Sequence, residues 1–166
     1  MSIIDPIIME LKEEAAKTRQ YLEIIPEDKF DWKPHVKSMS LIQLGSHLVE
    51  ILEWTIPTLD LDELSFNMED YKPWIARSIN EMLEKFDSNL ATMLGKMDGK
   101  SDEEMMKIWR MKVNGQVVLE LPRVTVVRAM VLNHSVHHRG QLSVYLRLND
   151  VHLPPLYGPT ADEQKV

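Results

Sequence analysis

The segment NHSVHHRGQL, residues 133–142, holds three of the chain's six histidines within five positions. A helical residue advances by about 100°, so His134 and His138 lie one above the other on one side of a helix. This i, i+4 spacing lets two imidazole rings reach a single metal ion. His47 falls on the apolar stripe of another expected helix. We therefore expect the three side chains to face the interior together and to form a metal site.

The alternative is a polar seam in the core that uses histidine without a metal. A lone interior histidine is more often a hydrogen-bonded core residue than a ligand. Burying three imidazoles without partners would cost on the order of 1–3 kcal/mol each, whereas a metal ion uses one nitrogen of each ring. The shared face of the three residues favours the metal, and the polar seam stays open as the second interpretation.

Other side chains are candidates to support the ligands or to line a substrate pocket. These candidates are His137, Arg139, Gln141, Tyr145, Trp32 and Trp54. His137 is about 60° off the stripe and should flank the site, while the directions of Arg139 and Gln141 stay open. The aromatic residues could equally belong to the core. His35 and His152 fall in expected loops, so we expect them to be solvated.

Other catalytic patterns do not fit the chain. The HExxH motif of the zincins needs glutamate after its first histidine, and Ser135 occupies that position. The di-iron carboxylate proteins need a Glu-x-x-His pair on two helices, and the sequence has no such pair. A nucleophilic serine at Ser46 or Ser135 would not sit on a strand-to-helix elbow. A histidine metal site is the pattern that the residues support best.

Four amphipathic helices are expected to position these residues. Apolar residues recur at helical spacing over residues 3–24, 40–57, 70–97 and 123–149. Ser40 and Gln43 have the spacing of a capping box, and Pro57 is expected to close that second helix. Residues 58–69 are expected to form a polar, acidic connection, and the proline-rich tail after residue 150 an ordered loop or strap.

A change of period precedes the last helix. β-branched and apolar residues lie on both sides of Asn114-Gly115, the preferred pair for a type I′ turn, which predicts a short β-hairpin over residues 108–122. The predicted fold is therefore all-α: a four-helix bundle with a short β-hairpin before the last long helix, in a single domain over residues 1–166.

Composition and charge narrow the function classes. The formal net charge is −7, and the positive charges are scattered singly, so nucleic acid is not an expected partner. The chain has no cysteine, which excludes disulfides, thiolate metal sites and cysteine nucleophiles and fits a reducing cytoplasm. The N-terminal segment lacks the features of a signal peptide. No run approaches the roughly 18 apolar residues of a membrane span, so we expect a cytoplasmic protein.

Two stretches of the chain resemble the DinB/YfiT-like superfamily of metalloenzymes. They are NHSVHHRGQLSVYLRLNDV with the following PPLYGPTADE, and DWKPHVKSMSLIQLGSHLVEILEW upstream. The resemblance runs from about residue 3 to 163. It implies a four-helix bundle, a homodimer and one divalent metal, most often nickel or zinc. By position, the ligands it implies are His47, His134 and His138. Some relatives act as transferases or hydrolases that use low-molecular-weight thiols.

Two functions follow from these observations. The first is a metal-dependent enzyme, either a thiol-dependent transferase or a hydrolase, acting on a small-molecule substrate. Three neutral protein ligands leave open coordination positions and an uncompensated positive charge, both of which are typical of catalytic metals. The second is a non-catalytic, metal-binding helical bundle that serves as a dimeric binding or stress-response module. A fourth protein ligand closing the coordination sphere would favour the second.

Overall fold

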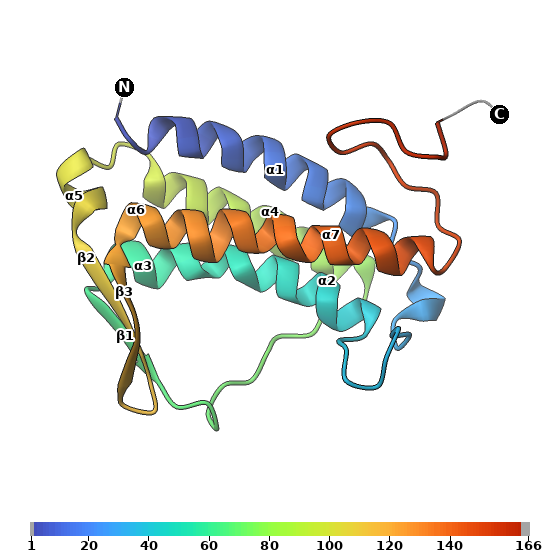
Figure 1. Ribbon diagram of the computed structural model, residues 1–166, viewed down its shortest axis with the longest axis horizontal. Coiled ribbons are helices and arrows are strands. Elements are labelled where there is room, and N and C mark those ends of the chain that lie inside the picture. The colour runs from blue at the N-terminus through green and yellow to red at the C-terminus, as the bar shows by residue number, and fades with distance from the viewer. Residues whose placement is uncertain (1, 164–166) are drawn as a thin grey trace.

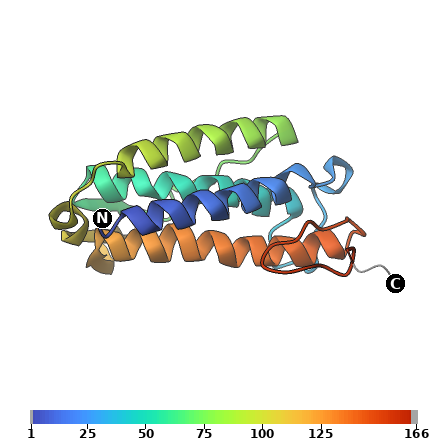
Figure 2. The same cartoon turned by 90° about the horizontal axis from the view of Figure 1, so that it is seen from above.

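The computed structural model describes residues 2–163 and is mostly helical, with one small sheet at one end (Figure 1). Four long helical segments run lengthwise beside one another (Figure 2). They are α1 (Asp5–Glu23), α2 (Leu41–Glu50) continued by η2 (Ile51–Trp54) and α3 (Thr55–Asp60), α4 (Ile79–Met97), and α6 (Arg123–Val126) continued by η3 (Val127–Asn133) and α7 (His134–Arg147). No helix within residues 2–163 combines the length and the apolar character needed to cross a membrane.

The first helix follows its predicted pattern. Pro6 lies in the first turn of α1, where a missing backbone N–H breaks no helical hydrogen bond. Ile7, Leu11, Ala15 and Leu22 are buried, as their spacing predicts. This face packs against both α4 and α7, so α1 covers one side of the core.

The second helical segment begins at the predicted capping box. The Gln43 side chain accepts a hydrogen bond from the Ser40 backbone N–H at 2.8 Å, and the Ser40 hydroxyl accepts one from the Gln43 N–H at 3.5 Å. The prediction that Pro57 closes this helix is wrong. The chain passes through η2, a 3₁₀ turn, and continues as α3 to Asp60. Pro57 lies in the first turn of α3, where its lack of an N–H is tolerated.

The third helix begins later than predicted. α4 starts at Ile79 rather than near residue 70, because Ser78 caps it by accepting a hydrogen bond from the Glu81 N–H at 3.1 Å. Residues 71–76, which include Pro73, have no regular secondary structure. The predicted apolar face is otherwise correct, since Met82, Phe86, Met93 and Met97 are all buried.

The sheet is larger than the predicted hairpin. β2 (Ile108–Val113) and β3 (Gln116–Pro122) are antiparallel, and Asn114 and Gly115 turn the chain between them with φ of 50° and 77°. β1 (Glu63–Phe66) adds to β2 in parallel and makes a mixed three-stranded sheet. The prediction of a hairpin alone is therefore wrong. The four residues of β1 lie in the expected acidic connection and are too few to give a clear alternation, and the short helix α5 (Asp102–Met106) was likewise not predicted.

The last helical segment shifts its phase before the histidines. η3 is a π-helix, whose turns are wider than those of an α-helix. The buried face therefore advances in steps of four residues from Val127 through Val131 to Ser135 and Arg139. The predicted stripe assigned His134 and His138 to this face, and both are in fact only half-buried. The histidines lie beside the core rather than inside it.

The C-terminal tail folds back along the helices as an ordered strap (Figure 1). The Tyr21 hydroxyl of α1 donates a hydrogen bond to the Pro154 carbonyl at 2.9 Å. Arg147, at the end of α7, pairs with Asp162 at 2.6 Å. Both ends of the strap are thus tied to the helices that flank it.

Candidate metal centre

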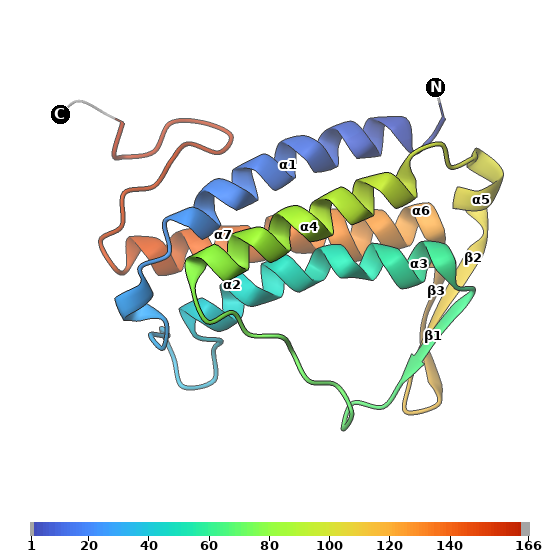
Figure 3. The ribbon, with the colours of Figure 1, turned by 180° about the vertical axis from the view of Figure 1, so that it is seen from behind.

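The three predicted histidines meet between two neighbouring helical segments. His47 belongs to α2, while His134 and His138 belong to α7, which packs against α2 (Figure 3). The Nε2 atoms of His47 and His134 are 3.4 Å apart, and those of His134 and His138 are 2.8 Å apart. One ligand atom from each ring lies within 4.8 Å of the others. The fold therefore brings together residues from positions far apart in the sequence.

These separations fit a bound metal ion. With Zn–N bonds of about 2.0–2.1 Å, two nitrogen ligands at a tetrahedral angle are roughly 3.3 Å apart. The separation of 3.4 Å between His47 and His134 matches this value. The 2.8 Å between His134 and His138 is closer to two ligands at a right angle, which lie roughly 2.9 Å apart for the same bond lengths. A slightly larger distance between the Nε2 atoms of His134 and His138 would give a three-nitrogen site with tetrahedral spacing.

A hydrogen bond to the outer side of one ring favours the same assignment. His138 Nδ1 lies 2.7 Å from the Gln141 side-chain oxygen, so this nitrogen donates and leaves Nε2 with a free lone pair. At 2.8 Å the Nε2 atoms of His134 and His138 can share a proton in an N–H···N hydrogen bond, or both can direct a lone pair at a cation. The donor set therefore suits a metal ion.

The surroundings also keep the rings neutral. Burial, followed by the neighbouring His138 and His134, lowers the pKa of His47 to about 4. Burial likewise lowers the pKa of His134 and of His138. Neutral imidazole is the form that binds a metal, so all three rings are ready to bind at neutral pH.

A cavity of ≈ 370 Å³ lies beside the cluster, and His47 lines it together with Gln43, Glu50 and Tyr71. Each of the three histidines is half-buried. Among residues 2–163, the group that could hold a metal contains these three histidines and no further ligand. A metal bound by three protein groups keeps coordination positions for water or substrate, and the cavity borders one of the three histidines, His47.

The supporting candidates have different positions. His137 flanks the cluster as expected, with its ring centre 4.8 Å from that of His138. Gln141 holds His138. Trp32 and Tyr145 pack edge to face with ring centres 5.6 Å apart, and both are half-buried. Trp54 lines a second, adjacent cavity.

Arg139 does not belong to this site. It is buried, and its guanidinium pairs with the Glu14 carboxylate and donates to the Glu14 carbonyl at 2.8 Å and to the Tyr157 hydroxyl at 2.5 Å. Arg139 directly follows His138 in the helix, so its side chain is turned by about 100°, toward α1. Arg139 therefore does not support the histidines. It forms a buried ion pair that joins α1, α7 and the tail.

Glu50 is a neighbour of the site that the sequence reasoning missed. One of its carboxylate oxygens accepts a hydrogen bond from the Trp74 N–H at 2.7 Å. The other oxygen is buried and has no hydrogen-bond partner in the part of the chain that the structure describes. Burial raises the pKa of this carboxyl group. The sequence feature that indicates this position is the spacing of three residues between His47 and Glu50, which places both side chains on one side of α2.

The chain matches a known family along almost its whole length. The model of the DinB family matches residues 5–165. No curated protein matches the chain by sequence.

Solved structures of DinB-like proteins share its fold. A DinB-like protein from Bacillus subtilis, YjoA, superposes with a TM-score of 0.69 at 16% identity, covering 94% of this chain and 100% of that one. A DinB-like protein from Bacillus cereus gives 0.70 at 16% identity, with coverage of 93% and 97%. A structure from Exiguobacterium sibiricum, solved as a member of the DinB family, gives 0.62 at 17% identity and covers 98% of both chains. At these identities the likeness establishes the fold.

Proposed function

This chain belongs to the DinB family, and from that premise we propose that it is a metal-dependent enzyme whose metal ligands are His47, His134 and His138. The observation that carries the proposal is the convergence of three neutral imidazoles on one point beside an accessible cavity. A purely structural site would normally have a fourth protein ligand.

We propose nickel or zinc as the native metal. Imidazole nitrogen is a suitable ligand for both ions, and the resemblance to the DinB/YfiT-like superfamily points the same way. A divalent ion held by neutral ligands lowers the pKa of a water molecule or a thiol beside it, which supplies a nucleophile at neutral pH.

The chain's own residues prepare the site for this chemistry. Gln141 fixes the ring of His138 with Nδ1 protonated, so Nε2 faces the other two rings. The cavity lined by Gln43, Glu50 and Tyr71 has room for a small molecule beside His47. Tyr71 and Glu50 supply polar groups on its wall, next to His47. These residues bind and orient the substrate, and the histidines hold the metal.

The reaction that we propose is a transfer from, or to, a low-molecular-weight thiol, with hydrolysis of a small-molecule substrate as the other possibility. Both reactions need a nucleophile at the same position. They differ in whether a thiol or water supplies it. A thiol can therefore be used to separate them.

Metal content tests the ligand assignment. Protein purified without added metal or an affinity tag should contain about one divalent ion per chain by elemental analysis. His134→Ala should lose most of this metal, because removing one of three ligands leaves only two. His152→Ala changes an exposed histidine outside the cluster and should keep its metal. Full metal occupancy in His134→Ala would refute the assignment.

A cobalt-substituted protein tests the reaction class. Titration with a small thiol should produce a sulfur-to-metal charge-transfer band, whereas the matching alcohol should not. If the thiol leaves the spectrum unchanged while azide alters it, hydrolysis is the better assignment. If neither changes the spectrum, the coordination sphere is closed and the non-catalytic metal-binding protein replaces the enzyme.

We also propose that the protein is a homodimer. Support comes from the resemblance and from apolar side chains left exposed on the sheet, such as Ile108, Val117 and Val118. Light scattering at micromolar concentration should give about twice the mass of one 19.3 kDa chain. A mass equal to that of one chain would exclude the dimer.

A further inference from the structure

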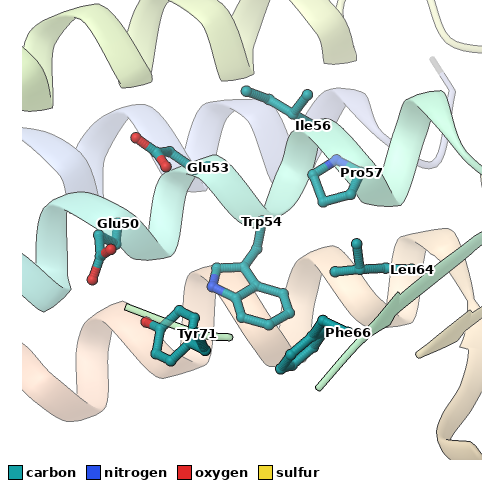
Figure 4. Close-up of a pocket in the computed structure, with 8 residues that line it drawn as sticks. All are labelled: Glu50, Glu53, Trp54, Ile56, Pro57, Leu64, Phe66 and Tyr71. Atoms are coloured by element: carbon teal, nitrogen blue, oxygen red, sulfur yellow. The ribbon is translucent and has the colours of Figure 1, made fainter. Parts of the chain in front are cut away.

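A second cavity, of ≈ 420 Å³, adjoins the one that contains His47. Its walls come from the end of α2, η2, α3, β1 and the loop after β1 (Figure 4). The lining residues are Glu50, Glu53, Trp54, Ile56, Pro57, Leu64, Phe66 and Tyr71. Glu50 and Tyr71 line both cavities. The second cavity, called here the aromatic cavity, is therefore continuous with the wall of the histidine site.

The aromatic cavity has two chemically different ends. Figure 4 shows the Glu50 and Glu53 carboxylates at one end, with the Tyr71 hydroxyl facing the Glu50 side, and Pro57, Leu64 and Phe66 at the other. Trp54 lies between the two ends. A ligand that fills this space needs an apolar body and a polar head that suits carboxylates.

The aromatic rings at the centre favour a cationic head. Phe66 packs near both Trp54 and Tyr71, with a ring-centre distance of 6.4 Å to each. The faces of aromatic rings carry negative potential and attract ammonium groups. The net charge of −7 on the whole chain adds to this preference.

The two carboxylates differ in what they can still bind. Glu53 is engaged by the Lys85 ammonium at 2.6 Å and by the Asn89 side-chain amide at 3.0 Å. Glu50 keeps one buried oxygen without a hydrogen bond of normal geometry to any described residue, and the Tyr71 hydroxyl is the polar group beside this carboxylate. A buried acceptor without a donor is costly. A ligand that brings an N–H group to this oxygen would remove that cost. A quaternary ammonium has no N–H group and could not do so.

We propose that the aromatic cavity binds a protonated amine attached to an apolar body, with the ammonium on Glu50 and the body against Phe66, Leu64 and Pro57. The binding site itself is independent of any metal. The further idea that the ligand of this cavity is the substrate of the histidine centre rests on the function proposed above. In that case Glu50 and Tyr71 would direct the polar end of the substrate toward His47.

Calorimetric titration of the full chain with three six-carbon probes tests the proposal. Hexylammonium should bind at least tenfold more tightly than 1-hexanol, because only the ammonium pairs with Glu50. It should also bind more tightly than hexyltrimethylammonium, which cannot donate a hydrogen bond. Equal affinity for hexylammonium and 1-hexanol would overturn the proposal, since the cavity would then be merely apolar. Tighter binding of the trimethylated probe would overturn the assignment to Glu50.

Variants locate the binding site and separate it from the metal. Glu50→Gln retains an oxygen for the Trp74 N–H but loses the charge, and it should abolish the preference for hexylammonium. Glu13→Gln removes one charge from the exposed surface of α1 and should leave the preference unchanged. The preference should persist in His134→Ala, which excludes direct binding of the amine to a metal. If it disappears there while Glu50→Gln retains it, the amine binds at the metal and the aromatic cavity is not its site.

Discussion

The three clustered histidines make the protein sensitive to mild acid. Burial holds the pKa of His47 at about 4, below its ordinary value of 6.5, and lowers the pKa of the other two rings. Between pH 6.5 and about 4 the unfolded chain therefore binds more protons at these positions than the metal-free fold does. The free energy of unfolding therefore has its full value, as far as these histidines are concerned, above pH 6.5. It decreases as the pH falls through this range.

Thermal melting of metal-free protein across this range measures the effect. The melting temperature should fall between pH 6.5 and pH 4.5, and His47→Asn should reduce the slope because one of the three groups no longer titrates. In metal-loaded wild-type protein, protons also compete with the ion, so bound metal should be lost below about pH 6. An identical slope in His47→Asn and wild type would contradict the lowered pKa.

The buried pair of Glu14 and Arg139 should be the most costly single interaction to break. Burial alone would raise the pKa of Glu14, but hydrogen bonds from Lys17, Tyr157 and Arg139 outweigh it and lower the value to about 2. Glu14→Gln leaves the guanidinium of Arg139 buried without its counter-charge, which should cost about 3–5 kcal/mol of unfolding free energy. Urea denaturation measures this loss.

An exposed ion pair on the same helix gives the control. Glu10 pairs with Arg128 at 3.2 Å, and both side chains are about half-exposed. Glu10→Gln should cost no more than about 1 kcal/mol, because exposed pairs are screened by water. The Glu14 contribution is present above pH 4.5 and decreases as the pH falls toward 2, since its pKa is lowered by folding. Similar losses in the two variants would show that the buried pair contributes little.

Local signals in the sequence predicted those elements whose ends are fixed by nearby residues. The capping box at Ser40 and the Asn114-Gly115 turn both form as predicted. The π-helical segment η3 has no such signal, and it moves His134 and His138 from the core face to its border. β1 was missed because its pairing with β2 joins residues far apart in the chain. These features depend on tertiary contacts rather than on local pattern.

The cap at Ser40 should stabilise the helix that carries His47. Ser40→Ala removes the acceptor for the Gln43 N–H and should cost about 1 kcal/mol of unfolding free energy. Ser38→Ala, two residues earlier and outside the helix, should be close to neutral. Urea denaturation of both variants makes the comparison. An equal effect at the two positions would mean that the capping box does not anchor α2.

Across the whole molecule, the meeting of the three histidines was easier to predict than their surroundings. The i, i+4 spacing of His134 and His138 is local, and His47 needed only a helical stripe. The direction of Arg139 stayed open and Glu50 was missed, because the roles of both residues depend on which segment lies opposite. Arg139 meets α1, and Glu50 meets the loop that carries Trp74. No spacing within one helix specifies such a neighbour.

The metal should not be needed for folding. The core is built from apolar residues of all four helical segments, among them Leu22, Leu48, Phe86 and Leu142, while the three clustered histidines lie at its border. A chelated sample should therefore keep its helical circular dichroism at 25 °C. Its melting temperature should fall, because a ligand that binds only the native state stabilises it, and adding the metal back should restore it. Collapse of the helical signal on chelation, with recovery only on adding metal, would instead make the site structural. That result would also remove the basis for open coordination positions at the histidines.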